Sequence, residues 1–319
     1  MHCPRRLALL LSFVASVPLP ALAADATRND ADAGFLRVTR DERGSPRTLD
    51  TAVVSYTNGR EGDERVTVDL VAAIHVGDRA YYETLNRKFE SYDAVLYELV
   101  APEGATPDDR PAEGDPHPIA VMQDGLKSLL DLEHQLAVVD YRKPNFVHAD
   151  MSPEDFEKAM KDRGESFVTM FLRLAFEGMR KPPQAGAGEA DDLKLILALL
   201  SPNRPMALKR VMAGQIAQFG DIASALDGPG GSAIVSDRNR KALEVLRAAL
   251  DDGKRRVCIF YGAAHMPDFE KRLLADFGLQ RADREWIVAW DMKPNPQSNE
   301  FLERLRKNRE AREKARRNP

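Results

Sequence analysis

The chain has 319 residues, 43% of them hydrophobic, and a formal net charge of −4 at pH 7. This composition is ordinary for a globular protein, which argues against extensive disorder, and nothing in the charge balance suggests a nucleic-acid partner. The length suffices for one large α/β domain or two smaller ones.

The first 23 residues have the three parts of a secretory signal peptide. Arg5-Arg6 forms a basic start, Leu7 to Val17 is an apolar run, and Ala21-Leu22-Ala23 is a small-residue cleavage site. The apolar run is about half the roughly 20 residues that a membrane span needs. We therefore expect cleavage after Ala23 and a periplasmic or secreted protein. Cleavage would remove Cys3 and leave Cys258 alone, which excludes an intramolecular disulfide.

Strand-like runs come from both ends of the remaining chain, and a helical region separates them. The runs that read as strands are Thr51 to Tyr56, Val66 to Val76, Ala94 to Val100, Val257 to Tyr261 and Trp286 to Asp291. This order predicts an α/β (α+β) fold, in which a small central mixed sheet is flanked by helices. We assign it to one domain over residues 24–298.

The middle of the chain is expected to form a helical insertion over about residues 152–226. It begins at Ser152-Pro153-Glu154-Asp155, a capping signal with proline at the first helical position. A Pro- and Gly-rich stretch from Lys181 to Ala190 interrupts it, and a second helical stretch runs from about Asp192 to Leu226. We expect a cap beside the site that governs substrate access. The alternative is that these amphipathic helices only pack on the core.

Residues 299–319 form a basic tail. From Phe301 to Pro319 the chain has eight Lys or Arg against three Glu, with almost no apolar residue after Leu305. Most such runs are solvated helices, and the alternative is a weak contact with an anionic membrane surface. Because the tail lacks an apolar stripe, we expect residues after about Asn299 to be dispensable for folding.

Two segments share one design, in which an apolar strand leads to a histidine, a turn and a helix. The second predicted strand leads into His75, and Asp78 is placed to cap the following helix. The fourth leads through Gly262 to His265, and Pro267 can start the next helix. Ligands of open α/β sheets gather beyond the carboxyl ends of strands, so both histidines are candidate site residues.

Three further candidates surround these histidines. Glu98 interrupts an apolar strand near its carboxyl end, and a buried carboxylate needs a cation or a metal as partner. If that strand simply alternates, Glu98 faces solvent instead. Arg238 and Asn239 open a predicted helix, from which Arg238 can orient Glu98 or neutralise developing charge. His148 precedes the insertion and is a candidate for a supporting contact or a substrate contact.

The motifs together resemble the TraB/GumN family, which includes the TIKI metalloproteases and is distantly related to ChaN-like haem-binding proteins and erythromycin esterases. They are Val71-Ala-Ala-Ile-His75, Leu96-Tyr-Glu-Leu99, Asp237-Arg-Asn-Arg240 and Tyr261-Gly-Ala-Ala-His265. The resemblance covers roughly residues 50–292 and implies a compact α/β fold with a site of two GxxH histidines and a glutamate. His75, Glu98 and His265 match by position, and Arg238 with Asn239 matches the arginine motif. Ala72 stands where the first GxxH has glycine.

Two imidazoles and one carboxylate can bind a divalent first-row metal such as Mn, Co or Zn and leave a position for water. The sequence therefore predicts an exported metal-dependent hydrolase that acts on a peptide or small-molecule substrate at an amide or ester bond. His75, His265 and Glu98 are the predicted ligands, and Glu98, Arg238 and Asn239 the predicted catalytic residues. The alternatives are a non-catalytic haem- or ligand-binding protein of the ChaN-like type and a metal-free hydrolase with a histidine as general base.

Overall fold

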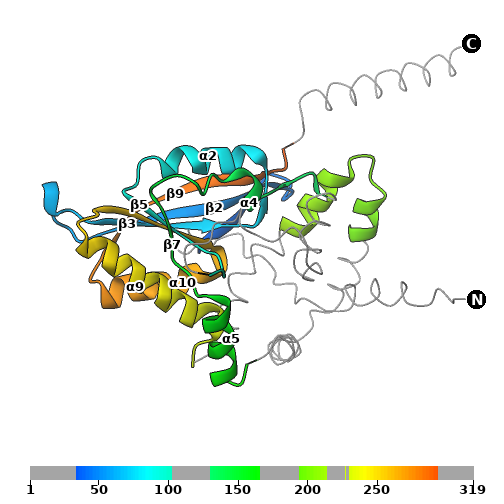
Figure 1. Ribbon diagram of the computed structural model, residues 1–319. Coiled ribbons are helices and arrows are strands. Elements are labelled where there is room, and N and C mark those ends of the chain that lie inside the picture. Colours follow the sequence, from blue (N-terminus) through cyan, green and yellow to red (C-terminus); the bar gives the residue numbers. More distant parts are fainter. Residues whose placement is uncertain (1–33, 103–129, 166–193, 214–226, 228–229, 294–319) are drawn as a thin grey trace, which may run out of the picture.

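The computed structural model describes residues 34–102, 130–165, 194–213, 227 and 230–293. These residues form a central mixed sheet flanked by helices, which confirms the predicted α/β class (Figure 1). The predicted signal peptide and basic tail lie outside the described residues, as do residues 166–193 and 214–226 of the expected insertion. In the described part of the chain, no helix is both long enough and apolar enough to span a bilayer.

The main sheet has seven strands in the order β1-β2-β3-β8-β5-β7, with β9 also paired to β2, and β4 and β6 form a separate pair. The strands are β1 Leu36–Arg40, β2 Pro46–Thr57, β3 Thr67–Ala73, β4 Val76–Gly77, β5 Ala94–Tyr97, β6 Glu133–His134, β7 Phe146–His148, β8 Arg256–Gly262 and β9 Gln280–Asp291. β2 runs antiparallel to β1, β3 and β9. β3, β8, β5 and β7 are parallel neighbours.

All five predicted strands are present, but two of them end earlier than predicted. β5 ends at Tyr97 rather than at Val100, so Glu98 follows the strand instead of interrupting it. The strand that was expected to run to Val76 ends at Ala73, and the chain bends at His75 before β4 begins. The apolar Val76 continues the sequence pattern, but its backbone pairs with His134 of β6 rather than with the main sheet. His75 therefore lies in a connection at the edge of the sheet.

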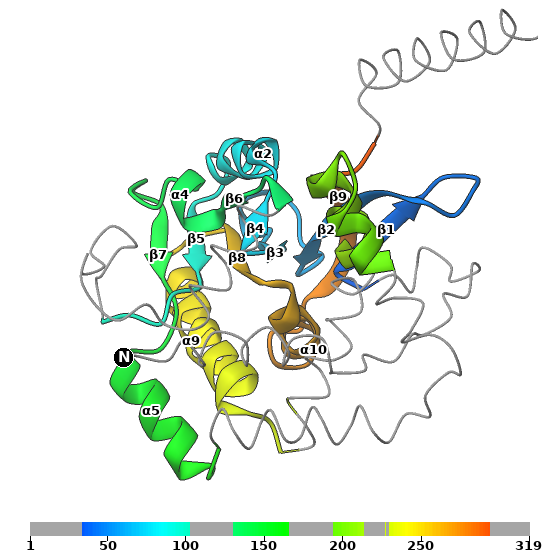
Figure 2. The same ribbon diagram turned by 90° about the vertical axis from the view of Figure 1, so that its right-hand side faces the viewer.

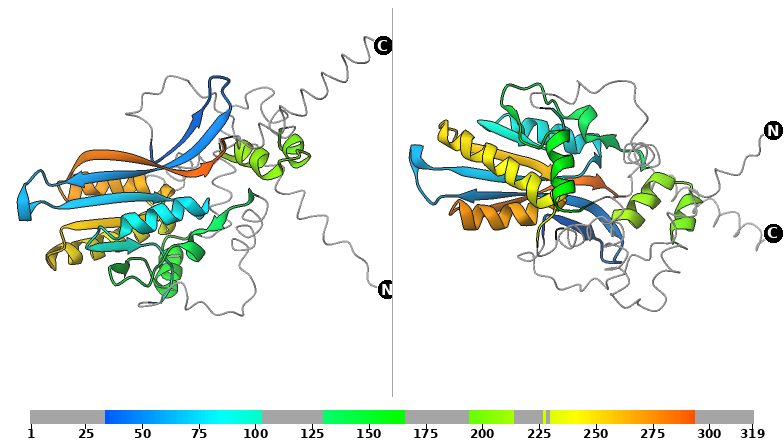
Figure 3. Two further views of the ribbon diagram at one scale, coloured as in Figure 1. Left: turned by 90° about the horizontal axis from the view of Figure 1, so that it is seen from above. Right: turned by 60° about the horizontal axis from the view of Figure 1, so that its bottom comes forward.

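Helices cover both faces of the sheet (Figures 1 and 2). They are α2 Arg79–Phe89, α4 Gln135–Val138, α5 Pro153–Asp162, α9 Arg238–Asp251 and α10 Met266–Asp276, with short turns η1 Gly62–Glu64, η3 Ala233–Asp237 and η4 Ala263–His265. α2 lies on one face, and α9 and α10 lie on the other, as the two views of Figure 3 also show. Residues 194–199 and 204–213 are helical as well.

Alternation along the central strands supplies each helical layer with a core. In β8, Phe260 belongs to the core cluster beneath α2, together with Phe89. Its neighbour Tyr261 belongs to the cluster beneath α9 and α10, together with Leu243 and Phe269. All five side chains are nearly or completely buried, and full burial of one large apolar side chain contributes about 1.5–3 kcal/mol. The two cores fix the central strands, and with them the strand ends.

The predicted helix start at Ser152 is confirmed, because the Ser152 hydroxyl accepts the Asp155 N–H at 3.0 Å at the first turn of α5. The second helical stretch was predicted without a break, but the structure contains one. Helix 194–199 stops and helix 204–213 begins anew, with Pro202, which has no N–H to donate, in the break. Asp78 stands before α2, but its side chain makes no cap. Its carboxylate accepts hydrogen bonds from Lys209 Nζ and the backbone N–H of Asp291 instead.

Candidate functional site

His75, Glu98 and His265 converge although they are far apart in the sequence. They follow β3, β5 and β8, three neighbouring parallel strands whose carboxyl ends lie at one edge of the sheet. The Cβ that Gly262 lacks would stand 3.3 Å from Glu98 Oε2 and 3.9 Å from both His75 Nε2 and His265 Cδ2. The predicted convergence is therefore observed, well inside the separation of about 10 Å between imidazoles that would exclude a shared ligand.

His75 is the exposed member of this group. Its side chain is available to solvent because the chain leaves the sheet at Ala73. The carbonyl oxygen of His75 accepts the Gln135 N–H at 2.9 Å, and the β4–β6 pair holds the residues that follow. The backbone of His75 is thus fixed from two sides, while its imidazole reaches both water and the space above Gly262.

Glu98 lies directly after β5 and does not face solvent, so the simple alternation considered for this strand is wrong. Its Oε1 accepts from Arg238 Nη2 at 2.7 Å, and its Oε2 accepts the Gly262 N–H at 2.7 Å. Burial alone would raise the pKa of Glu98, but the charge of Arg238, the two histidines and the Gly262 N–H together hold that pKa well below its usual range. Glu98 is therefore ionised at neutral pH.

Arg238 opens α9 and is buried between two carboxylates. Its Nε donates to Asp150 Oδ1 at 2.9 Å, and its Nη2 donates to Asp150 Oδ2 at 2.5 Å as well as to Glu98. Burial acts to lower the pKa of Arg238, but the charges of Glu98 and Asp150 and the hydrogen bond to Asp150 outweigh it and raise that pKa. The guanidinium is thus a permanent, oriented positive charge inside the site.

Asp150 is a site residue that sequence reasoning missed. The residue is only 2% exposed, and it follows β7, the fourth parallel strand, at the same edge of the sheet as the other site residues. The strand-end rule applies to it in the same way. The signal was lost because β7 has three residues, too few for a recognisable apolar run.

Asn239 fixes the tautomer of His265. The fully buried Asn239 uses its Nδ2 to donate to His265 O at 3.0 Å and to Asp268 Oδ2 at 2.8 Å. Its Oδ1 therefore faces His265 Nδ1 at 2.7 Å as an acceptor, so Nδ1 carries the proton and Nε2 keeps a lone pair. This matches the common pattern in which the second nitrogen of a working histidine is held by an amide or carboxylate.

The reactive face of His265 points at charged groups. Nε2 lies 3.5 Å from Arg238 Nη1 and 3.6 Å from Glu98 Oε1. Burial is the largest influence, and although Glu98 opposes it, burial and the charge of Arg238 lower the pKa of His265 to about 4. His265 is consequently neutral at pH 7.

His148 contacts the backbone beside the site rather than Glu98 itself. Its Nε2–H donates to Leu99 O at 2.5 Å, and its ring lies 5.7 Å from that of Tyr97. Both partners adjoin Glu98 in the sequence, so His148 holds the chain where it leaves β5.

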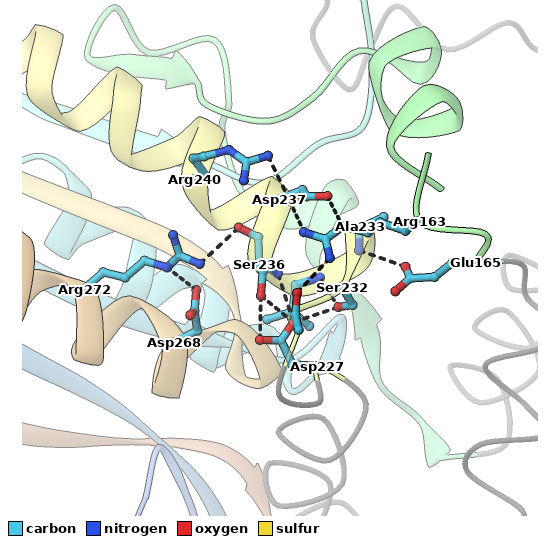
Figure 4. A network of polar contacts seen from close by, with 12 residues as sticks. Arg163, Glu165, Asp227, Ser232, Ala233, Ser236, Asp237, Arg240, Asp268 and Arg272 are labelled. Atoms are coloured by element: carbon cyan, nitrogen blue, oxygen red, sulfur yellow. Dashed lines mark hydrogen bonds and ion pairs between the residues drawn. The ribbon is translucent and has the colours of Figure 1, made fainter. Parts of the chain in front are cut away.

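A second polar network holds the turn from which Arg238 projects (Figure 4). η3 is a π-helical turn that ends at Asp237. The Asp237 carboxylate binds Arg163, which follows α5, at 2.6 and 2.7 Å. Asp227 accepts the hydroxyls of Ser232 and Ser236 from the other side. Arg238 thus leaves a turn that is held on two sides.

The donor set for a divalent metal is present, but Arg238 lies where the cation would be. Both Glu98 oxygens already accept N–H groups, and His265 Nε2 faces the guanidinium. Repulsion between unit charges 4 Å apart is about 4 kcal/mol at an effective dielectric constant of 20, and a dication doubles it. Among the described residues, no group of three or more His, Cys, Asp or Glu is arranged to hold a metal. A metal, or a haem iron on His265, therefore does not fit unless Arg238 moves.

Comparison with models of known protein families, with characterised proteins and with solved structures finds no significant match for this chain. The TraB/GumN resemblance therefore remains a prediction, and the functional argument depends on the geometry of the site.

Proposed function

We propose that the protein is a hydrolase of amide or ester bonds in which a histidine, rather than a bound metal, activates the attacking water. The observation that carries this proposal is the position of Arg238, a buried cation bonded to Glu98 and Asp150 and adjacent to His265 Nε2. It supplies at this site the positive charge that a metal would otherwise provide, and it needs no further ligand.

His75 is the better candidate for the general base. A base must reach water and must be able to take up a proton, and the His75 imidazole is exposed. The ionised Glu98 stabilises the imidazolium that forms. His265 is buried beside a guanidinium, and a pKa of about 4 makes it a weak proton acceptor at neutral pH. Its Nε2 faces Arg238 Nη1, so its role is to position the guanidinium rather than to take the proton.

The reaction then follows from the positions of these groups. Water loses a proton to His75, and its oxygen bonds to the carbonyl carbon in the space that Gly262 leaves open. The carbonyl π electrons move to the oxygen, where Arg238 Nη1 stabilises the negative charge. This nitrogen makes the long 3.5 Å contact with His265. The tetrahedral intermediate collapses, the bond to the leaving group breaks, and His75 returns the proton to the leaving amine or alcohol.

The test combines elemental analysis with hydrolysis of a panel of p-nitrophenyl esters and peptide anilides. We expect activity that survives exhaustive treatment with a chelator and is lost in His75→Gln. Arg79→Gln, a change at an exposed side chain four residues away, is the matched control and should retain activity. Activity that disappears with the chelator and returns with Mn, Co or Zn would favour the metal-dependent alternative. A Soret band in the purified protein would favour haem binding.

A further inference from the structure

We propose that Arg163 is a positioning residue for Arg238, so that α5 and the residues after it control the geometry of the site. This inference rests on the role proposed for Arg238 above. It assigns a specific function to one end of the helical insertion, which the sequence suggested only as a cap.

The turn before Arg238 needs external support. η3 covers Ala233–Asp237 and is π-helical, a conformation that is rare and frequently occurs at functional sites. Gly231 precedes it with a φ of +72°, and a Cβ at that position would lie 2.6 Å from Ser236 Oγ. A side chain could not be accommodated there without moving the turn.

Arg163 and Glu165 hold both ends of this turn (Figure 4). At the far end, the Arg163 fork donates to both oxygens of Asp237. Before the near end, its Nη1 donates to Gly230 O at 2.9 Å. At the near end, Glu165 Oε2 accepts the Ala233 N–H at 2.9 Å. The Asp237 side chain is 5% exposed and that of Arg163 is 28% exposed, so the carboxylate is shielded, and the two-pronged contact defines its geometry.

Asp237 is the residue immediately before Arg238, so a shift of the backbone at Asp237 also shifts the backbone from which the guanidinium projects. Arg238 must meet Glu98 and Asp150 at once, and these two residues follow the ends of β5 and β7. A misplacement of about 1 Å in a catalytic group can reduce the rate roughly 100-fold. Loss of the Arg163 fork should therefore lower the rate of the chemical step more than it lowers substrate binding.

The chain provides a matched control for this contact. Arg240 also binds Asp237 Oδ1, at 2.9 Å, but it belongs to α9 and its side chain is 58% exposed. Arg163→Met and Arg240→Met each remove one cation from the same carboxylate. Only the first change removes a contact between the end of α5 and the turn. Arg163→Lys keeps the charge but cannot form the two-pronged contact.

The experiment measures native-state hydrogen exchange of the amides over residues 233–240, together with kcat and KM for the best substrate of the panel. We expect Arg163→Met to speed exchange in this segment about tenfold or more, with the β8 amides unchanged, and to lower kcat about tenfold with little effect on KM. Arg163→Lys should resemble Arg163→Met, and Arg240→Met should resemble the wild type.

Several outcomes would overturn the inference. The first is unchanged hydrogen exchange in Arg163→Met. The second is faster exchange throughout the protein, which would indicate a purely structural contact. The third is faster exchange only in residues 233–240 with an unaltered kcat. If the wild-type protein hydrolyses no substrate of the panel, the proposed function fails. Exchange alone then decides whether Arg163 holds the turn, so the two failures are distinguishable.

Discussion

Replacement of Arg238 with methionine should destabilise the protein strongly at neutral pH. Methionine retains much of the buried volume, but Glu98 and Asp150 lose the guanidinium that both of them bind. Removing one partner of a buried ion pair costs about 3–5 kcal/mol, because the remaining charge is buried without compensation. For a domain of this size, where 1 kcal/mol shifts the melting temperature by about 2–4 °C, a decrease of about 10 °C is expected.

The pH dependence of the stability difference between the variant and the wild type tests this prediction independently. In the wild type, the depressed pKa of Glu98 stabilises the folded state at pH values above the unfolded pKa, and this stabilisation is lost on acidification. In Arg238→Met the two carboxylates are buried without a cation, and burial then raises the folded pKa of Glu98 above the unfolded one. The variant therefore gains relative stability as the pH falls from 7 towards about 4, where the unfolded carboxylates also take up protons. The difference between the two proteins should narrow with acidification.

Urea unfolding followed by circular dichroism at pH 7 and pH 5 measures both effects. Arg240→Met is the control, because its exposed ion pair should contribute less than about 1 kcal/mol. Adding Glu98→Gln to Arg238→Met should restore part of the lost stability by removing one unpaired charge. A loss below about 1 kcal/mol at pH 7, or a difference that widens towards acid, would refute the argument that the guanidinium compensates two buried carboxylates.

Three further predictions follow from single observations. Gly262→Ala should lower hydrolytic activity at least about tenfold while costing less than roughly 1 kcal/mol of stability. The new methyl group would lie 3.3 Å from Glu98 Oε2, in the space that His75 also reaches, and full activity in steady-state assays would contradict the proposed substrate position. Wild-type stability should fall by on the order of 3 kcal/mol as the pH drops from about 6.5 to about 4, because His265 takes up a proton in the unfolded chain but stays neutral in the folded one. In pH-dependent urea titrations His265→Asn should remove this slope, and an unchanged slope would assign it to another group. Truncation after Asn299 should leave the melting temperature nearly unchanged in calorimetry, whereas a decrease of several degrees would show that the tail docks on the domain.

The strand-end rule predicted most of the site because three of its members follow apolar strands long enough to be recognised. His75, Glu98 and His265 obey the rule, and the parallel order β3-β8-β5 brings them together. Asp150 obeys it too, but the strand before it is short, and its Val147 is 36% exposed. A short, partly exposed strand carries almost no hydrophobic pattern.

The remaining errors come from contacts between distant parts of the chain. Asp78 stands where a capping residue belongs, yet Lys209 and the backbone of Asp291 bind its carboxylate. The pairing of Val76 with His134 ended a strand that the local pattern would have continued. Neither partner is near in sequence, and local propensity gives way when tertiary contacts compete with it.

The position of β8 in the sheet also sets the order in which the protein can be completed. β3 and β5 precede β8 in the chain, yet β8 lies between them and pairs with both. The earlier strands cannot close the middle of the sheet by themselves, and such non-local pairing folds slowly. If residues 1–23 direct export as predicted, a chain that is still crossing the membrane lacks the strand that brings His75 and Glu98 together. The site would then form only once β8 has crossed as well.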